Sequence, residues 1–224
     1  MLKFLLKGLF RDRHRSLLPV IVTSIGVMLT VVFHAWLTGI LGDSIEYNAR
    51  FSSGHVKIMT KAYAENSDQM PNDLALLNSA EMIDSLQKMY PSFNWAERIH
   101  FAGLIDVPDE KGETLQQGTA IGFGIDLLSG KTDDINRMNI PASLKSGKLP
   151  QKQGEVLLSH LFAGKLKIKP GDKITLISST MYGEMSMTNL TLCGTIEFGT
   201  AFLDRGTIIA DLNDARKALN MENA

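Results

Sequence analysis

The chain has 224 residues, of which 44% are hydrophobic, and this length accommodates one ordinary domain together with a membrane segment. Its formal net charge of −1 hides a basic N-terminus, because Lys and Arg predominate before residue 16 and acidic residues outnumber basic ones afterwards. The mildly acidic remainder argues against nucleic acid as a partner, and the single cysteine, Cys193, excludes an intrachain disulfide.

Residues 1–16 form a predicted cytoplasmic segment with an amphipathic pattern. Leu and Phe side chains recur at helical spacing along one side, and Lys and Arg follow another side. Two interpretations stay open for this segment. It is either an interfacial helix on the inner leaflet of the membrane or the plain cytoplasmic flank of a signal anchor.

Residues 17–42 form the predicted transmembrane helix. No Lys, Arg, Asp or Glu occurs from Ser16 to Gly42, and as a helix this run is about 40 Å long, against a hydrocarbon core of about 30 Å. A cleaved signal peptide is the alternative, but its apolar region is only about 7–15 residues long and ends in small residues, which His34-Ala35-Trp36 does not provide. We therefore predict an uncleaved anchor in the cell inner membrane. The preceding basic residues keep the N-terminus cytoplasmic and place residues 43–224 in the periplasm.

Four residues within the span are candidates for a role beyond hydrophobic length. Gly26, Met28 and Val32 are candidate contacts to another helix or to an acyl chain. His34 is the one titratable side chain of the span. It is either a functional group or a neutral imidazole near the outer interface, and the second reading is favoured because no intramembrane carboxylate accompanies it.

The exported segment is expected to begin with a helical stalk over residues 43–50 and a short alternating strand over residues 54–59. A polar surface loop is expected next, over residues 61–76. The helix that follows is one that Asn78 is placed to cap, with Glu81 three residues further on. Apolar residues at helical spacing predict its buried face, and a proline ends it: Met82, Ile83, Leu86, Met89 and Pro91.

Strand patterns dominate the remaining sequence, with two more helices among them. We predict strands over residues 98–107, 118–125, 154–158 and 207–210, a helix over residues 159–167, a long hairpin of residues 172–179 with 184–198, and a final helix over residues 212–219 capped by Asp211. Pro170, Gly171 and Asp172 fit a type II turn before the hairpin, with glycine where φ must be positive. Strands and helices mix without strict alternation, so the fold class is α+β.

We predict no catalytic, cofactor or metal site in this chain. Gly122 and Gly124 lie in a run that resembles a phosphate loop but lacks its third glycine, so strand glycines at a bulge are expected instead. Met181, Met185 and Met187 could bind a soft metal, although a core or interface stripe is the more common use of such residues. Several other polar or reactive residues are expected to be structural, namely Asp133 and Asp134 as a solvated loop or helix start, Ser159 and His160, and Cys193 as a small apolar residue.

The order of segments resembles a known family. A basic start and one apolar helix precede a series of short motifs, which are Gly54-His55-Val56-Lys57-Ile58, Ile121-Gly122-Phe123-Gly124-Ile125-Asp126, the segment over residues 144–149, Gly154-Glu155-Val156-Leu157-Leu158-Ser159, the run over residues 166–176, and Gly194-Thr195-Ile196 leading to Asp204. Together they resemble the N-terminal half of an FtsX-like permease of an ABC transporter with a MacB-like periplasmic core domain. Within that family they most resemble the lipoprotein-releasing LolC/LolE type.

This resemblance implies a function and a set of partners. Such permeases have four membrane helices, with the periplasmic domain between the first and the second. A separate cytoplasmic ATPase drives a permease homodimer or heterodimer, so this chain itself would not be an enzyme, and ATP-driven motion would reach the periplasmic domain for lipoprotein release or substrate export. This chain ends about where the second helix would begin, which makes it an N-terminal fragment or a lone relative. The alternative is a single-span anchored sensing or adaptor domain that does not transport.

The region expected to meet a periplasmic client or carrier protein is the tip of the long hairpin. Its candidate residues are Thr180, Met181, Tyr182, Gly183, Glu184, Met185 and Met187.

Overall fold

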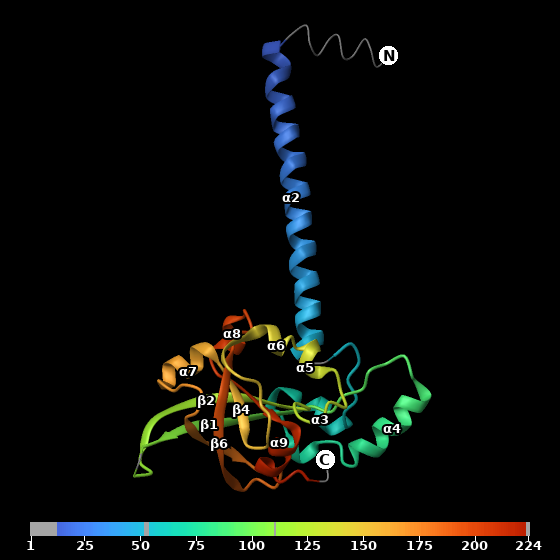
Figure 1. Ribbon diagram of the computed structural model, residues 1–224. Helices are drawn as coiled ribbons and strands as arrows, with labels where there is room; N and C mark the ends of the chain where they lie inside the picture. The colour runs from blue at the N-terminus through green and yellow to red at the C-terminus, as the bar shows by residue number, and fades with distance from the viewer. Residues whose placement is uncertain (1–12, 52–53, 110, 223–224) are drawn as a thin grey trace. The chain divides into compact units, whose positions relative to one another are not determined.

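The structure, a computed structural model, describes residues 13–51, 54–109 and 111–222 (Figure 1). Contacts within the chain divide it into two units, with the boundary between Lys57 and Ile58. The first unit contains one long helix, and the second contains all the strands and the shorter helices. We describe the two units separately.

Helix α2 spans Arg13–Phe51 as one continuous helix of 39 residues. Its stretch from Leu17 to Phe51 is long and apolar enough to cross a membrane. The helix confirms the helical prediction for residues 17–42 and its continuation through residues 43–50. The hydroxyls of its threonines donate to the carbonyl four residues earlier at 2.8–2.9 Å, in the pairs Thr23 to Pro19, Thr30 to Gly26 and Thr38 to His34. These hydroxyls therefore need no partner from outside the helix.

The segment before the first strand differs from the prediction. Residues 54–59 form no strand, because Gly54 has a φ of +64° and both Val56 and Ile58 are exposed, so the alternating pattern has no neighbouring strand to pack on. The expected loop over residues 61–76 lies at the surface but contains three helical turns, α3 (Lys61–Glu65), η1 (Ser67–Gln69) and η2 (Asn72–Leu74).

Helix α4 spans Ser79–Met89, where a helix was predicted, but its details differ. Asn78 occupies the N-cap position in a left-handed conformation, and its side chain makes no capping hydrogen bond. Instead the Ser79 hydroxyl donates to the carboxylate of Glu97 at 2.5 Å. The predicted buried face is wrong, because no residue of α4 is buried and Met89 is 62% exposed. Helical spacing identifies the apolar side of a helix but not whether another element covers it.

Seven strands form one mixed sheet: β1 (Ile99–Pro108), β2 (Thr114–Ile125), β3 (Leu144–Gly147), β4 (Glu155–Ser159), β5 (Lys173–Ser179), β6 (Met185–Ile196) and β7 (Thr207–Asp211). The strand order is β3-β6-β4-β7-β2-β1-β5, and β5 also pairs with β6. Six strands therefore close into a barrel. Strand β3 pairs antiparallel with the C-terminal part of β6, while the N-terminal part of β6 pairs with β5. The α+β class is confirmed, and its centre is a closed barrel.

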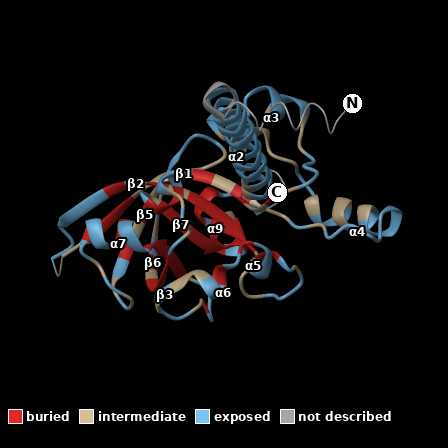
Figure 2. Ribbon diagram, turned by 90° about the horizontal axis from the view of Figure 1, so that it is seen from above, coloured by how far each residue is buried: buried red, intermediate tan, exposed pale blue. Residues whose placement is uncertain are grey.

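Two helices cover the apolar interior of the barrel at different positions along β2. In α7 (His160–Leu166), Phe162 lies so close to Gly118 that a Cβ there would be 2.5 Å from its ring. In α9 (Leu212–Leu219), Ala215 approaches Gly124 in the same way. The interior strand residues and these helix residues belong to one buried cluster. Figure 2 shows buried residues in red along much of the strands. The helices thus exclude water from the barrel interior.

A second buried layer lies on the outer face of the barrel. Helices α5 (Asp134–Arg137) and α6 (Ile140–Ser143) lie in the chain between β2 and β3, and Met138 and Ile140 are almost fully buried there. Asp134 accepts two hydrogen bonds from Arg98 at 2.7 and 2.9 Å, which ties α5 to the residues before β1. Asp134 was predicted to lie in a solvated loop or at a helix start. It begins a helix, and its side chain is buried rather than solvated.

The glycines of β2 serve close packing, and the predicted bulge is wrong. Strand β2 pairs with β1 without a register shift from Gly124 back to Gln116. A Cβ at Gly122 would lie 2.1 Å from the Phe101 ring, and a Cβ at Gly124 would lie 2.5 Å from the Cβ of Ala215. Only glycine leaves room for these groups, so Gly122 and Gly124 are needed where Phe101 and Ala215 pack directly against the backbone of β2.

The remaining C-terminal predictions are confirmed. The predicted strands and helices correspond to β1, β2, β4, β5, β6, β7, α7 and α9, with ends that differ by a few residues. Asp211 caps α9, since its carboxylate accepts the Asn213 N–H at 3.0 Å.

Candidate functional site: the β5–β6 hairpin and its groove

The candidate site is the tip of the hairpin formed by β5 and β6. The two strands pair antiparallel from Lys173 opposite Thr191 to Ser179 opposite Met185. The chain then reverses over residues 180–184. The Thr180 N–H donates to the Glu184 carbonyl at 2.7 Å, and the Glu184 N–H donates to the Thr180 hydroxyl at 3.1 Å.

Gly183 makes this reversal possible. Its φ is +83°, a conformation that glycine adopts without steric cost, and its N–H donates to the Thr180 carbonyl at 3.0 Å. A short loop with glycine in the left-handed position is one of the common hairpin connections. The hairpin predicted from the sequence is confirmed, including the position of its turn.

The structure divides the candidate residues of the tip into two groups. Met181 is half-buried against the core, and its N–H donates to the Leu219 carbonyl at the end of α9 at 2.8 Å. In contrast, Tyr182, Met185 and Met187 are 69%, 73% and 63% exposed. Met185 and Met187 share one face of β6, because they are two residues apart on a strand. Met181 therefore fixes the tip, while the other three side chains are presented to solvent.

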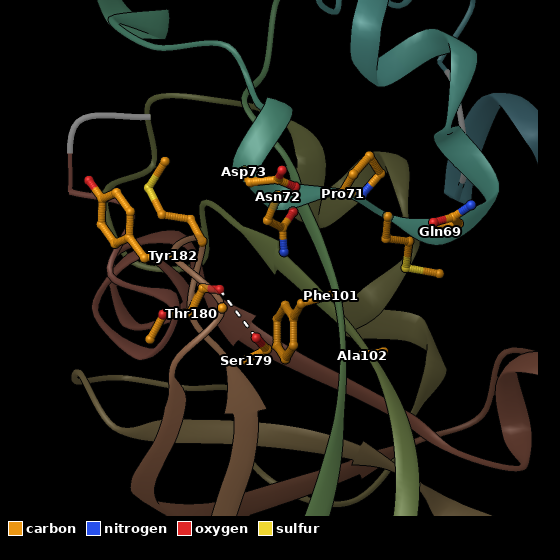
Figure 3. A pocket seen from close by; sticks show the side chains of 12 residues that line it. Gln69, Pro71, Asn72, Asp73, Phe101, Ala102, Ser179, Thr180 and Tyr182 are labelled. Atoms are coloured by element: carbon orange, nitrogen blue, oxygen red, sulfur yellow. Dashed lines mark hydrogen bonds between the residues drawn. The ribbon is translucent and has the colours of Figure 1, made fainter.

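A groove of about 520 Å³ lies beside the tip (Figure 3). One wall is formed by residues 179–183 of the hairpin together with Phe101 and Ala102 of β1. The opposite wall is formed by residues 69–73, from η1 to the start of η2. In Figure 3 the ring of Phe101 lies near Ser179, while Asn72 and Asp73 lie across from them. The groove therefore offers hydroxyl groups and a carboxylate to one ligand or peptide segment, beside the buried ring of Phe101.

The sequence analysis missed the wall formed by residues 69–73. The segment was predicted as a surface loop, and its proline and polar residues carry no sign of a contact some 110 positions away. Met70 has a φ of +50°, which is rare for a residue with a side chain and is not encoded by any motif. Only the three-dimensional fold brings this segment to the hairpin.

The predicted turn at the other end of β5 is confirmed. The Asp172 N–H donates to the Lys169 carbonyl at 3.1 Å, and Gly171 has a φ of +106°. The Gly171 N–H also donates to the Leu192 carbonyl of β6 at 2.7 Å. Pro170, Gly171 and Asp172 therefore anchor the base of the hairpin, at the end opposite to its tip.

The candidate residues of α2 lie on a separate unit and on two sides of the helix. Met28 and Val32 are four residues apart, so they share a face, and both side chains are exposed. Gly26 is two residues before Met28 and points about 200° away from it. The three residues therefore do not form one contact surface.

Ser159 and His160, next to each other in the chain, are engaged in structural hydrogen bonds. The Ser159 hydroxyl is buried and donates to the Asp204 carbonyl at 2.8 Å. A ring nitrogen of His160 lies 3.1 Å from the hydroxyl of Thr195, which also bonds to Ser146 at 2.7 Å. Within the described part of the chain, no three His, Cys, Asp or Glu side chains are grouped to hold a metal ion.

Cys193 behaves as the sequence predicts, as a small buried residue of a strand. Its thiol donates to the Val156 carbonyl at 3.2 Å. Burial, with a smaller contribution from the charge of Glu155, raises the pKa of the thiol to about 11. At neutral pH the group is therefore protonated and unreactive.

No model of a known protein family matches this chain, and no curated protein sequence matches it either.

Proposed function

We propose that this chain is the anchored first segment of an FtsX-like, MacB-like permease of the lipoprotein-releasing type, and that its hairpin tip meets an exported client or carrier protein. In this proposal α2 is the first membrane helix, and the barrel unit is the periplasmic domain. A cytoplasmic ATPase and a second permease protomer would be its partners, and lipoprotein release or substrate export would be the outcome.

The observation that carries the proposal is the order of segments. A basic start is followed by the apolar run of α2, and the motif residues from Ile121 onward fall on β2, β4, β5, β6 and α8 (Ala201–Asp204) of the second unit, whereas the motif of residues 54–58 forms no strand. The run over residues 154–159 forms β4 and leads into α7, and the run over residues 166–176 forms the turn and β5. These motifs therefore lie in the hairpin and in the elements beside it, and this placement supports the proposal.

Membrane anchoring is supported by the length and composition of α2. A helix of 39 residues is about 58 Å long, which exceeds the roughly 40–45 Å of a bilayer with its headgroups. The segment Ser16–Gly42 has no charged residue, and the threonine hydroxyls of α2 are bonded within the helix. Both properties lower the cost of placing α2 in lipid.

Contact with a client is supported by the chemistry of the tip. Exposed tyrosine and methionine side chains supply large, adaptable apolar area, and such residues are enriched where proteins bind one another. Tyr182, Met185 and Met187 provide this area on an element whose base is fixed by the Pro170 turn. The groove beside Tyr182 adds hydrogen-bonding groups. A lone adaptor domain would use the same surface without an ATPase.

Topology is the first test. Cys193 is a poor reporter because it is buried, so we would replace it by Ser and introduce Leu115→Cys at an exposed position of β2. A small membrane-impermeant maleimide should label this cysteine in intact cells. Labelling only after lysis would contradict the proposed orientation. A Val32→Asp variant should lose membrane insertion, because a mid-membrane carboxylate costs about 2.5–3.5 kcal/mol. Unchanged insertion would show that Val32 does not lie in the bilayer.

Transport is tested by the partner and by the tip. A P-loop ATPase should co-purify with the chain expressed from its natural gene, and its reproducible absence would favour the adaptor alternative. Tyr182→Ala and Met185→Ala should lower lipoprotein release without changing the melting temperature, because both side chains are exposed. Leu115→Ala, at an equally exposed apolar residue on another strand, should leave release unchanged.

A further inference from the structure

Two exposed apolar side chains lie on adjacent helices of the second unit. Helices α7 and α8 contact each other, as Figure 1 shows. Leu161 of α7 is 59% exposed, and Phe202 of α8 is 68% exposed. The Ser159 hydroxyl at the start of α7 donates to the Asp204 carbonyl at the end of α8. Each apolar side chain is therefore two residues from the same buried hydrogen bond, which fixes the two helices together.

A basic side chain follows each of these apolar ones. Lys165 comes four residues after Leu161, and Arg205 comes three residues after Phe202, so each pair shares one side of its helical turn. Both basic side chains are exposed, and within the part of the chain that the structure describes neither forms an ion pair. We call these four residues the α7/α8 corner.

The carboxylates of the neighbouring segment are engaged elsewhere. Glu197 pairs with Lys145. Asp204 is buried, and its carboxylate accepts the Phe198 N–H at 2.8 Å. In the sequence, residues 156–171 contain three lysines and no acidic residue. The α7/α8 corner thus combines unpaired positive charge with exposed apolar area.

We propose that the α7/α8 corner docks on the anionic surface of the membrane that anchors the chain. Leu161 and Phe202 enter the boundary between headgroups and acyl chains, and Lys165 and Arg205 meet the lipid phosphates. An anionic bilayer attracts basic side chains and offers hydrocarbon just beneath its phosphates. The four residues match both properties of that surface.

The tether favours lipid over an acidic protein surface as the occupant. Helix α2 ends at Phe51, and the second unit begins at Ile58. Seven residues of chain reach at most about 25 Å, and the part of α2 after Gly42 adds about 14 Å. The barrel therefore stays within about 40 Å of the bilayer, where a weak lipid contact benefits from a high effective concentration. In this respect the inference rests on the proposed membrane anchoring.

Docking at this corner also orients the hairpin tip. Ser159, which precedes α7, pairs with Ile196 at the C-terminal end of β6, whereas Met185 at the tip begins that strand. A strand of 12 residues spans roughly 35–40 Å. The corner and the tip therefore lie at opposite ends of β6. A barrel that rests on lipid at the α7/α8 corner holds its tip away from the bilayer, where an exported carrier approaches.

The test uses the full chain in liposomes, with Cys193→Ser as background and a fluorescent probe on Ala201→Cys, an exposed position of α8. Lipids that carry a spin label near the headgroup quench a probe close to them. Quenching should be about threefold stronger in liposomes with about 30% phosphatidylglycerol than in phosphatidylcholine alone. Salt at about 1 M should remove most of this difference, because it screens exposed charges. A probe on Met185→Cys should stay unquenched in both.

Variants of the corner separate its two contributions. Lys165→Glu together with Arg205→Glu should abolish the preference for anionic liposomes, because both attractions become repulsions. Leu161→Ser should lower quenching of the Ala201→Cys probe about twofold in anionic liposomes, through lost apolar contact. The altered side chains are exposed, so every variant should melt at the parent temperature.

The matched controls are Lys88→Glu and Met89→Ser, which change an exposed lysine and an exposed apolar residue of α4 and should leave quenching unchanged. Equal quenching in neutral and anionic liposomes would overturn lipid docking and leave the corner to an acidic protein. Charge reversals without effect, or controls that lower quenching equally, would overturn it too. A quenched Met185→Cys probe would overturn the orientation. Alkaline extraction of each sample tests the anchoring separately, since a chain released from the liposomes contradicts it, whereas the dependence of quenching on anionic lipid reports on the α7/α8 corner.

Discussion

Gly122 and Phe101 provide a sharp test of how the barrel interior is packed. In a Gly122→Ala variant the new Cβ would lie 2.1–2.5 Å from three carbon atoms of the Phe101 ring. Carbon atoms in contact normally lie about 3.5–4 Å apart, so the ring would have to retreat by more than 1 Å. Phe101 is only 1% exposed and belongs to the main buried cluster, so neighbouring side chains oppose its movement. Overpacking of this kind costs about 1–3 kcal/mol, and we expect a value near the upper end.

The assay is thermal unfolding of the detergent-solubilised chain, followed by near-ultraviolet circular dichroism. For a unit of this size each kcal/mol lowers the melting temperature by about 2–4 °C, so a fall of roughly 6–12 °C is expected. Adding Phe101→Leu should recover part of the loss, because the smaller side chain makes room for the Cβ.

Gly164→Ala is the control. Gly164 lies in α7 with open space around its Cα, so alanine there should stabilise the fold by about 0.5–1 kcal/mol. A Gly122→Ala variant that melts at the parent temperature would refute the packing argument. A double variant no better than Gly122→Ala alone would show that the strain lies elsewhere.

Three further predictions concern single residues. With a pKa of about 11, Cys193 should react with maleimide at pH 8 at least a hundredfold more slowly than a cysteine introduced at the exposed Leu115. In urea the two cysteines should react at the same rate. Fast labelling of Cys193 in the native state would contradict its burial. Burial, and then the charge of Asp211, raise the pKa of Asp214 above its usual 3.8, so the folded chain holds this proton to higher pH than the unfolded chain. The stability that this group contributes is present below the pKa of the unfolded chain and is lost as the pH rises through the pKa of the folded chain. Asp214→Asn should therefore flatten the decline in urea midpoint that begins near pH 4. An equal slope in both proteins would assign the decline to another group. Gly171→Val should lower the free energy of unfolding by about 1–3 kcal/mol through its φ of +106° alone, since no atom lies within 4 Å of the new Cβ, and an unshifted urea midpoint would count against that strain.

The sequence predicts best the elements whose signals are local. The turn at Pro170, Gly171 and Asp172, the hairpin reversal at Gly183 and the cap at Asp211 all depend on a few neighbouring residues, and the structure has each of them. Their chemistry acts within four positions, so no distant part of the chain is needed to recognise them.

Errors arose where a distant element decides the outcome. The alternation over residues 54–59 predicts a strand, but no strand lies beside it. The spacing in α4 predicts a buried face, but the described chain covers it only in part, so none of its residues is buried. Gly122 and Gly124 were expected at a bulge, whereas Phe101 and Ala215 occupy the space above them. In each case the sequence pattern is present, but the sequence does not show which distant element packs against it.

The candidate site shows the same division. The exposed tip of the hairpin follows from its turn and its alternating side chains, and it was found from the sequence. The groove depends on residues 69–73 reaching the tip from the other side of a long chain interval, with Met70 in an uncommon backbone conformation. Contacts of that kind are set by the barrel as a whole.

Closure of the barrel has a mechanical consequence for the hairpin. A strand at the edge of an open sheet yields to a pull by peeling away one hydrogen bond at a time. Strand β5 has β1 and β6 as neighbours, β6 has a second neighbour from Thr191 onward, and the turn at Gly171 is tied to Leu192. A pull along β5 therefore acts on hydrogen bonds to two neighbouring strands together, which opposes the peeling that would free an edge strand.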